Sequence, residues 1–217
     1  MSFTPRPEPA AGRAVFYAPE VAFDRPIPKV PAAVFFAERE AAFAVDAPTG
    51  MIACDVAKQL KSPWPATTPT MLARYVVVRS GDMLDHQLNS SGEVYYVIRG
   101  AGETDCVGER FAWTCGDAFC LPGGEAVRHR ASSDAILMLV TNEPELDYLR
   151  AGPDETAIEP TLFPGEIIEQ HLRNVHGRNG EQQAAGKSVV FLTAMMAERR
   201  VTTPTLLSAI NTLEPGA

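Results

Sequence analysis

Glycine recurs at short intervals through the middle of the chain and separates segments rich in β-branched and aromatic residues. Between Leu72 and Thr141 the glycine turns lie roughly eight to twelve residues apart, a spacing typical of a β-sandwich or barrel. The sequence therefore predicts a fold that is all-β at its centre, with no alternation of strands and long helices. The predicted strands are 75–79, 94–98, 103–107, 110–113, 117–121, 126–130 and 136–141.

The segments before and after this region have a different character. Seven prolines lie between the N-terminus and Pro31, with Pro31 included, and they predict an extended N-terminal arm. Residues 32–45 are compatible with either a short helix or an edge strand. Near the other end, Pro164-Gly165 precedes an amphipathic pattern over 166–175, which predicts a short helix. A polar loop at 178–187 and a buried strand at 188–196 are expected to follow.

One phrase occurs twice, 135 residues apart: Thr67-Thr68-Pro69-Thr70 and Thr202-Thr203-Pro204-Thr205. A leucine follows both copies in the same register, and each copy precedes a strand-like segment. This repeat predicts two similar domains, of which the second is only begun before Ala217. We therefore expect four parts: an N-terminal arm with flanking elements at 1–65, a barrel at 66–145, a linker with a short helix at 146–187, and an incomplete second repeat at 188–217. An incomplete repeat would leave an open apolar edge, which invites self-association.

Composition excludes several classes of function. A net charge of −8 argues against nucleic acid as a partner, because phosphate binding requires a concentrated basic surface. We find neither a signal peptide nor an apolar run long enough to span a bilayer, so no membrane partner is expected. The four cysteines lack paired metal-binding spacing and are too few for a disulfide scaffold, which predicts reduced thiols and a cytoplasmic protein.

Two spacings in the β region carry a family resemblance. Glu93 is followed after six residues by Gly100 and is preceded by His86, while Gly116 is followed after five residues by Pro122, then by Gly124 and His129. This pattern resembles the two motifs of the cupins. The duplicated phrase and the helix between its copies extend the resemblance to bicupins, and within these to the gentisate 1,2-dioxygenase-like group.

The resemblance implies a jelly-roll barrel with a mononuclear metal site, in which Fe(II) or another divalent metal is held by imidazole and carboxylate ligands. Alternate residues of a strand share a face, so side chains from facing strands can converge inside such a barrel. The resemblance further implies ring opening of a small aromatic acid by a homo-oligomer.

This chain departs from the motif at two ligand positions, because Leu88 stands in place of the second histidine and Val127 in place of the last. His129 shares the face of Val127, one rung further along the strand. A metal triad of His86, Glu93 and His129 is therefore one interpretation, and a domain that holds no metal is the other.

The same strand suggests a contact for a ligand. If Glu93 faces inward, Tyr95 and Arg99 share its face and could bind a carboxylate. The alternative is that Tyr95 is a core residue and that Arg99 extends into solvent at the strand end.

Two functions remain open. The first is the degenerate half of a bicupin, structural or ligand-binding, which Leu88 and Val127 favour. The second is an active non-haem Fe(II) dioxygenase module, which His86, Glu93 and His129 favour.

Overall fold

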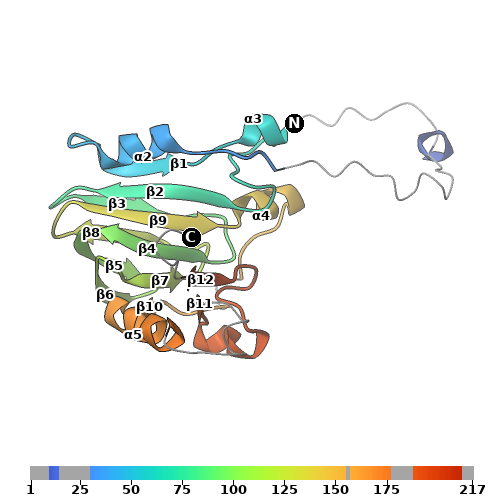
Figure 1. The fold of residues 1–217 in the computed structure, drawn as a ribbon. Helices are drawn as coiled ribbons and strands as arrows, with labels where there is room; N and C mark the ends of the chain where they lie inside the picture. The colour runs from blue at the N-terminus through green and yellow to red at the C-terminus, as the bar shows by residue number, and fades with distance from the viewer. Residues whose placement is uncertain (1–9, 15–29, 155–156, 177–187, 212–217) are drawn as a thin grey trace.

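Two antiparallel sheets face each other and enclose the core of the molecule (Figure 1). The computed structural model describes residues 10–14, 30–154, 157–176 and 188–211. The expected polar loop at 178–187 and nearly all of the expected arm lie outside these ranges. The prediction of an all-β centre is confirmed, and each predicted central strand is present with ends shifted by a few residues.

The larger sheet, sheet A, has six strands in the order β1-β2-β9-β4-β7-β10. The smaller, sheet B, has four in the order β3-β8-β5-β6. Sheet A is formed by β1 (Gly50–Ala53), β2 (Leu72–Val78), β4 (Glu93–Arg99), β7 (Ala118–Leu121), β9 (Ala135–Thr141) and β10 (Thr161–Phe163), and sheet B by β3 (Met83–His86), β5 (Ala101–Cys106), β6 (Glu109–Thr114) and β8 (Val127–Ala131).

Apolar side chains from both sheets fill the space between them. Strand alternation gives β4 its inward face of Glu93, Tyr95 and Val97, and the same rule turns Tyr96 outward. Phe119 and Trp113, from opposite sheets, stack within this core. The core therefore surrounds one buried carboxylate, which must find partners inside the protein.

Four α-helices in the described part of the chain lie outside the two sheets. The segment 32–45, which the sequence leaves as helix or strand, contains a helix that packs on the outer side of β1 and β2. The helix predicted at 166–175 is confirmed, and Ile168 on its apolar side packs against Ala118 of sheet A. The helices are α2 (Phe36–Phe43), α3 (Ala57–Leu60), α4 (Glu143–Leu149) and α5 (Gly165–His176).

The predicted strand at 188–196 is wrong in its second half. Strand β11 (Ser188–Phe191) ends before a 3₁₀ helix, η3 (Ala194–Arg199), and then β12 (Ser208–Asn211) pairs with β11. The carbonyl of Phe191 accepts a hydrogen bond from the Thr202 hydroxyl at 2.7 Å, so the strand ends where the second copy of the repeated phrase meets it. An apolar run alone does not distinguish a strand from a short helix.

The sheets also extend beyond the segment 66–145 expected for the barrel. Strand β1 pairs with β2 at one edge of sheet A, and β10 pairs with β7 at the other.

Among the described residues, no helix is long and apolar enough to cross a membrane.

Candidate functional site

Glu93 enters the space between the sheets from the first position of β4, and its side chain is fully buried. Two neighbours bind the same carboxylate oxygen. The Tyr95 hydroxyl donates to Oε2 at 2.5 Å, and His86 Nε2 lies 2.9 Å from it. The Tyr95 hydroxyl is also 3.0 Å from His86 Nε2, so the three side chains form one compact group.

His86 ends β3 with its ring pointing into the interior, and only 7% of its side chain is exposed. Strand β3 is absent from the strands predicted from the sequence. It has only four residues, and just two of them point inward, which is too short a pattern to recognise. The structure therefore places His86 at the end of a strand with its side chain buried, and not in an exposed loop.

His129 lies on β8 and is fully buried beside His86. The two imidazole rings stack with centroids 5.3 Å apart. In the ladder, His86 faces Val127 while His129 faces Leu84, which places His129 one rung from the position that the motif gives to a ligand. The expectation that His129 points inward is thus confirmed.

Thr104 and Trp113, which the sequence does not single out, orient His129 from the far side. The indole Nε1–H of Trp113 donates to Thr104 Oγ1 at 2.8 Å, and that oxygen is 2.8 Å from His129 Nδ1. With the indole hydrogen as a donor to it, the Thr104 hydroxyl can give its own hydrogen to Nδ1, which then places the imidazole hydrogen on Nε2. A hydroxyl and an indole across two strands leave no recognisable spacing in the sequence.

Burial sets the ionisation of this group. Burial and, to a smaller extent, the neighbouring His86 together lower the pKa of His129 to about 3, so His129 is neutral at physiological pH. Burial and the Glu93 carboxylate raise the pKa of Tyr95 well above its usual value, so its hydroxyl remains a donor. Burial, with Glu93, also raises the pKa of the Cys106 thiol to about 12, which excludes it as a thiolate nucleophile.

Three buried atoms of the predicted triad have no hydrogen-bond partner among the described residues: His86 Nδ1, Glu93 Oε1 and His129 Nε2. Imidazole nitrogen and carboxylate oxygen are suitable donors for a divalent metal. Their arrangement does not match, because no group of three His, Cys, Asp or Glu side chains in the described ranges is placed to hold a metal ion. Glu93 faces His86 and Tyr95 directly, and the residues therefore fit a metal in kind but not in arrangement.

Tyr95 and Arg99 are not brought together. Tyr95 is buried, whereas Arg99 is exposed and lies over the Phe43 ring, 5.8 Å from its centroid. A register shift between Val97 and Arg99 interrupts strict alternation, so Arg99 does not continue the inward face. The four-residue separation corresponds to about 13 Å along the strand.

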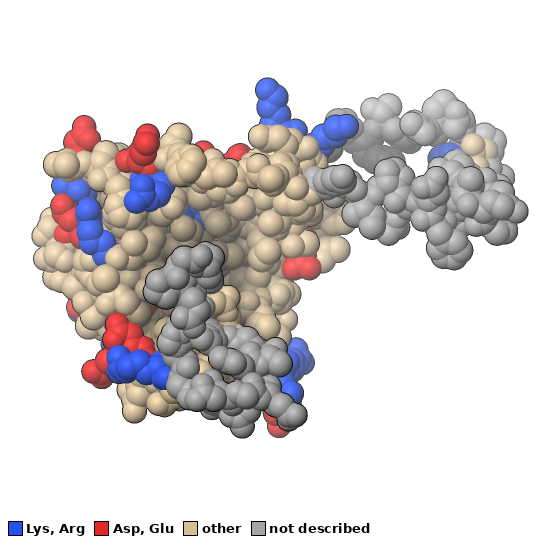
Figure 2. Space-filling view, in the orientation of Figure 1, with Lys and Arg blue, Asp and Glu red and all other residues tan. Residues whose placement is uncertain are grey.

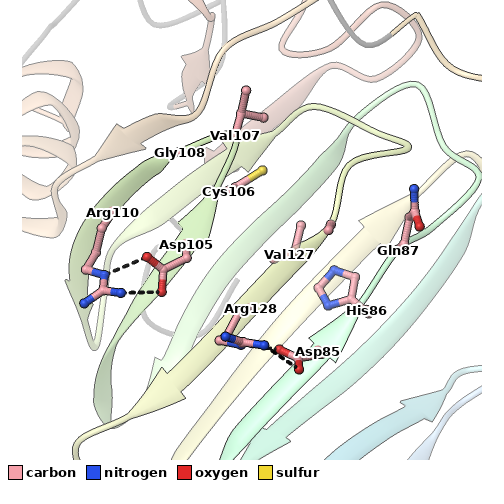
Figure 3. Close-up of a pocket in the computed structure, with 11 residues that line it drawn as sticks. Asp85, His86, Gln87, Asp105, Cys106, Val107, Gly108, Arg110, Val127 and Arg128 are labelled. Atoms are coloured by element: carbon pink, nitrogen blue, oxygen red, sulfur yellow. Dashed lines mark hydrogen bonds and ion pairs between the residues drawn. The ribbon is translucent and has the colours of Figure 1, made fainter.

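A pocket of about 680 Å³ opens at the ends of β3, β5 and β8 (Figure 3). His86, Cys106 and Val127 line it from the interior side of sheet B. Its charged side chains are already paired, since Arg128 binds both carboxylate oxygens of Asp85, and Arg110 those of Asp105. The pocket gives a small molecule access to the edge of His86 but presents no arginine free of a carboxylate.

These geometries define a two-sheet cupin fold with a polar cluster at the motif positions. No family model matches the chain. The chain is 30% identical over 105 residues to 5-aminosalicylate 1,2-dioxygenase from Comamonas sp. The aligned region covers 46% of this chain and 28% of that protein. The resemblance predicted from the sequence is thereby confirmed: about half of the chain is homologous to a ring-cleaving dioxygenase.

Solved structures with a similar fold include salicylate 1,2-dioxygenase from Pseudoaminobacter salicylatoxidans with gentisate adducts. Its TM-score is 0.41 at 24% identity, over 52% of this chain and 30% of that one. The EutQ protein of Clostridium difficile matches with a TM-score of 0.36 at 17% identity, over 46% of this chain and 73% of that one. The chain spans less than a third of the length of the dioxygenases it matches.

Proposed function

We propose that this chain is the degenerate half of a gentisate 1,2-dioxygenase-like bicupin, a domain that is structural or binds a small ligand. The observation that carries the proposal is the direct contact of Glu93 with Tyr95 and His86. A buried carboxylate oxygen that already accepts hydrogen bonds from two neighbouring side chains has less to gain from a cation.

Leu88 and Val127 support this assignment. Leu88 packs against the core cluster, and Val127 is a buried member of it. Neither side chain offers a lone pair, so two of the positions that the motif gives to imidazoles carry hydrocarbon instead.

The alternative is an active Fe(II) dioxygenase module that opens the ring of an aromatic acid. The three unpartnered atoms of His86, Glu93 and His129 favour it. In that case a side-chain rearrangement would have to separate His86 from Glu93 before a metal could bind.

We propose that any ligand of this domain is a small aromatic or carboxylate molecule. The pocket at His86 is the site for it, and Tyr95 would act through His86 because its hydroxyl is buried. For the whole chain, we further propose the organisation 1–65, 66–145, 146–187 and 188–217 expected from the sequence, with 188–217 as the opening of a second repeat.

A metal titration distinguishes the two functions. Fe(II) is added anaerobically to the wild type, to Glu93→Gln, and to Asp85→Asn as a control on the exposed face of β3. The degenerate domain should show no saturable binding in any of the three. Binding of one equivalent by the wild type and Asp85→Asn, lost in Glu93→Gln, together with oxygen uptake in the presence of gentisate or 5-aminosalicylate, would establish the active module instead.

A further inference from the structure

One hairpin turn contains a residue that its backbone conformation disfavours. The turn between β5 and β6 consists of Val107 and Gly108, since Cys106 pairs with Glu109 across it. Both residues of the turn have positive φ, 51° for the valine and 76° for the glycine. Such a turn favours Asn-Gly, because the branched Cβ of valine crowds the backbone in the left-handed region. Val107 is therefore held against its own conformational preference.

The other non-glycine residues with positive φ in the described part of the chain have an ordinary explanation. Lys61, Arg150 and Arg200 each follow the last residue of a helix, where a left-handed residue commonly ends the helical turn. Their side chains are also unbranched at Cβ. Val107 alone among these four has a branched Cβ and does not end a helix. The geometry of the turn thus gives no reason for a valine.

Burial gives no reason for this valine either. Val107 is 56% exposed, so more than half of the residue remains accessible to solvent. Packing in the core therefore does not offset the unfavourable φ. Residues in disfavoured backbone conformations are concentrated at ligand contacts and active sites, where the side chain has a role that the turn alone does not need.

The position of Val107 suggests such a role. It lines the pocket of about 680 Å³ that also contains the edge of His86 (Figure 3). Cys106 and Val127 line the same pocket and are buried, which leaves Val107 as its large exposed apolar side chain among the described residues. Both arginines of the pocket already bind carboxylates. A ligand there would therefore gain much of its affinity from apolar contact.

We propose that Val107 is a ligand contact at the mouth of this pocket, where its isopropyl group packs on the apolar face of a small ring-bearing molecule. The inference rests on the small-ligand function proposed above and adds the residue that sets the preference for a ring. The disfavoured φ lowers the stability of the free protein, and the apolar contact strengthens the complex. An asparagine at this position would relax the turn but would place an amide against the ring.

Val107→Asn separates these two effects, because it should change stability and binding in opposite directions. The turn becomes Asn-Gly, so the melting temperature should rise by about 2–4 °C. The apolar contact is lost, so the dissociation constant for gentisate, measured by isothermal titration calorimetry, should increase at least about fivefold. A valine that only supports the hairpin would not produce this opposition.

One variant and one ligand serve as controls. Val45 is 88% exposed and is not among the residues with positive φ, so Val45→Asn removes an exposed valine without relaxing a turn. It should leave both the melting temperature and gentisate binding unchanged. Succinate has carboxylates but no ring, and the wild type should bind it at least about tenfold more weakly than gentisate.

Three results would overturn the role of Val107. If Val107→Asn binds gentisate as tightly as the wild type, the ring does not contact the valine. If the melting temperature of this variant does not rise, the valine is not held in a disfavoured conformation. Succinate binding as tight as gentisate binding would mean that no ring is recognised. A wild type that binds no gentisate is a different result, since it contradicts the ligand-binding function itself and the inference with it.

Discussion

Tyr95 is the residue on which the arrangement of the interior depends most directly. Its hydroxyl donates to Glu93, and its ring stacks on Phe119 with centroids 4.5 Å apart. Removal of the hydroxyl leaves a buried carboxylate with one partner fewer, which costs more than the loss of an exposed hydrogen bond.

Tyr95→Phe should therefore lower the free energy of unfolding by about 1–3 kcal/mol, measured by urea denaturation. Tyr96→Phe is the matched control, because its side chain points to the opposite face and is 40% exposed. The control should change stability by less than about 0.5 kcal/mol. Equal effects of the two substitutions would show that the Tyr95 hydroxyl is not holding Glu93.

The candidate residues could be predicted in part from their spacing. His86, Glu93 and His129 do converge between the sheets, because strand alternation and the two motif spacings fix their faces. The sequence could not show that Tyr95 binds Glu93, nor that Thr104 and Trp113 hold His129. These contacts depend on which strands become neighbours. For Arg99 the sequence left two positions open, inward beside Tyr95 or extended into solvent, because the register shift that decides between them is not visible in the residue types.

Among the secondary structure elements, the repeated phrase has a structural explanation. Each copy turns the chain back so that a threonine hydroxyl bridges two strands, and valine at that position would keep the shape while losing both hydrogen bonds. Glycine turns predicted most strands of the centre, whereas β1, β3 and β10 have only three or four residues each, too few to give a clear pattern in the sequence. Their existence depends on longer partners in the sheets.

Thr202→Val should cost about 1–3 kcal/mol locally and expose the amides of β11 and β12 to hydrogen exchange, with β2 and β9 unchanged. Thr70→Val is the control, since Thr70 belongs to the same phrase and is exposed. Hydrogen exchange detected by mass spectrometry separates these regions. Protection of β11 and β12 that survives Thr202→Val would mean that the bridge is dispensable.

For the molecule as a whole, the two copies of the phrase differ in what covers them. Thr203 of the second copy packs against Gly92, where an added Cβ would come within 2.8 Å of its methyl group, and Thr205 contacts the Ser91 hydroxyl. The second copy of the phrase therefore lies against the two residues that directly precede Glu93. In the first copy, Met71 is 36% exposed, while the equivalent Leu206 is buried. The duplication could be predicted from the sequence, but which copy is covered could not, because coverage depends on how distant segments pack.

The degenerate domain proposed above requires a neutral His129 that is held by Thr104 and binds no metal. Nitrogen-15 NMR of the imidazole tests this directly, as the spectrum distinguishes the two tautomers and the charged form. Because the pKa of His129 lies at about 3, the ring should stay neutral, with its hydrogen on Nε2, from pH 8 down to pH ~4. Addition of one equivalent of Zn²⁺ should change neither nitrogen. A hydrogen on Nδ1, together with a large shift of Nε2 when Zn²⁺ is added, would show that His129 is a metal ligand and would contradict a domain that binds no metal.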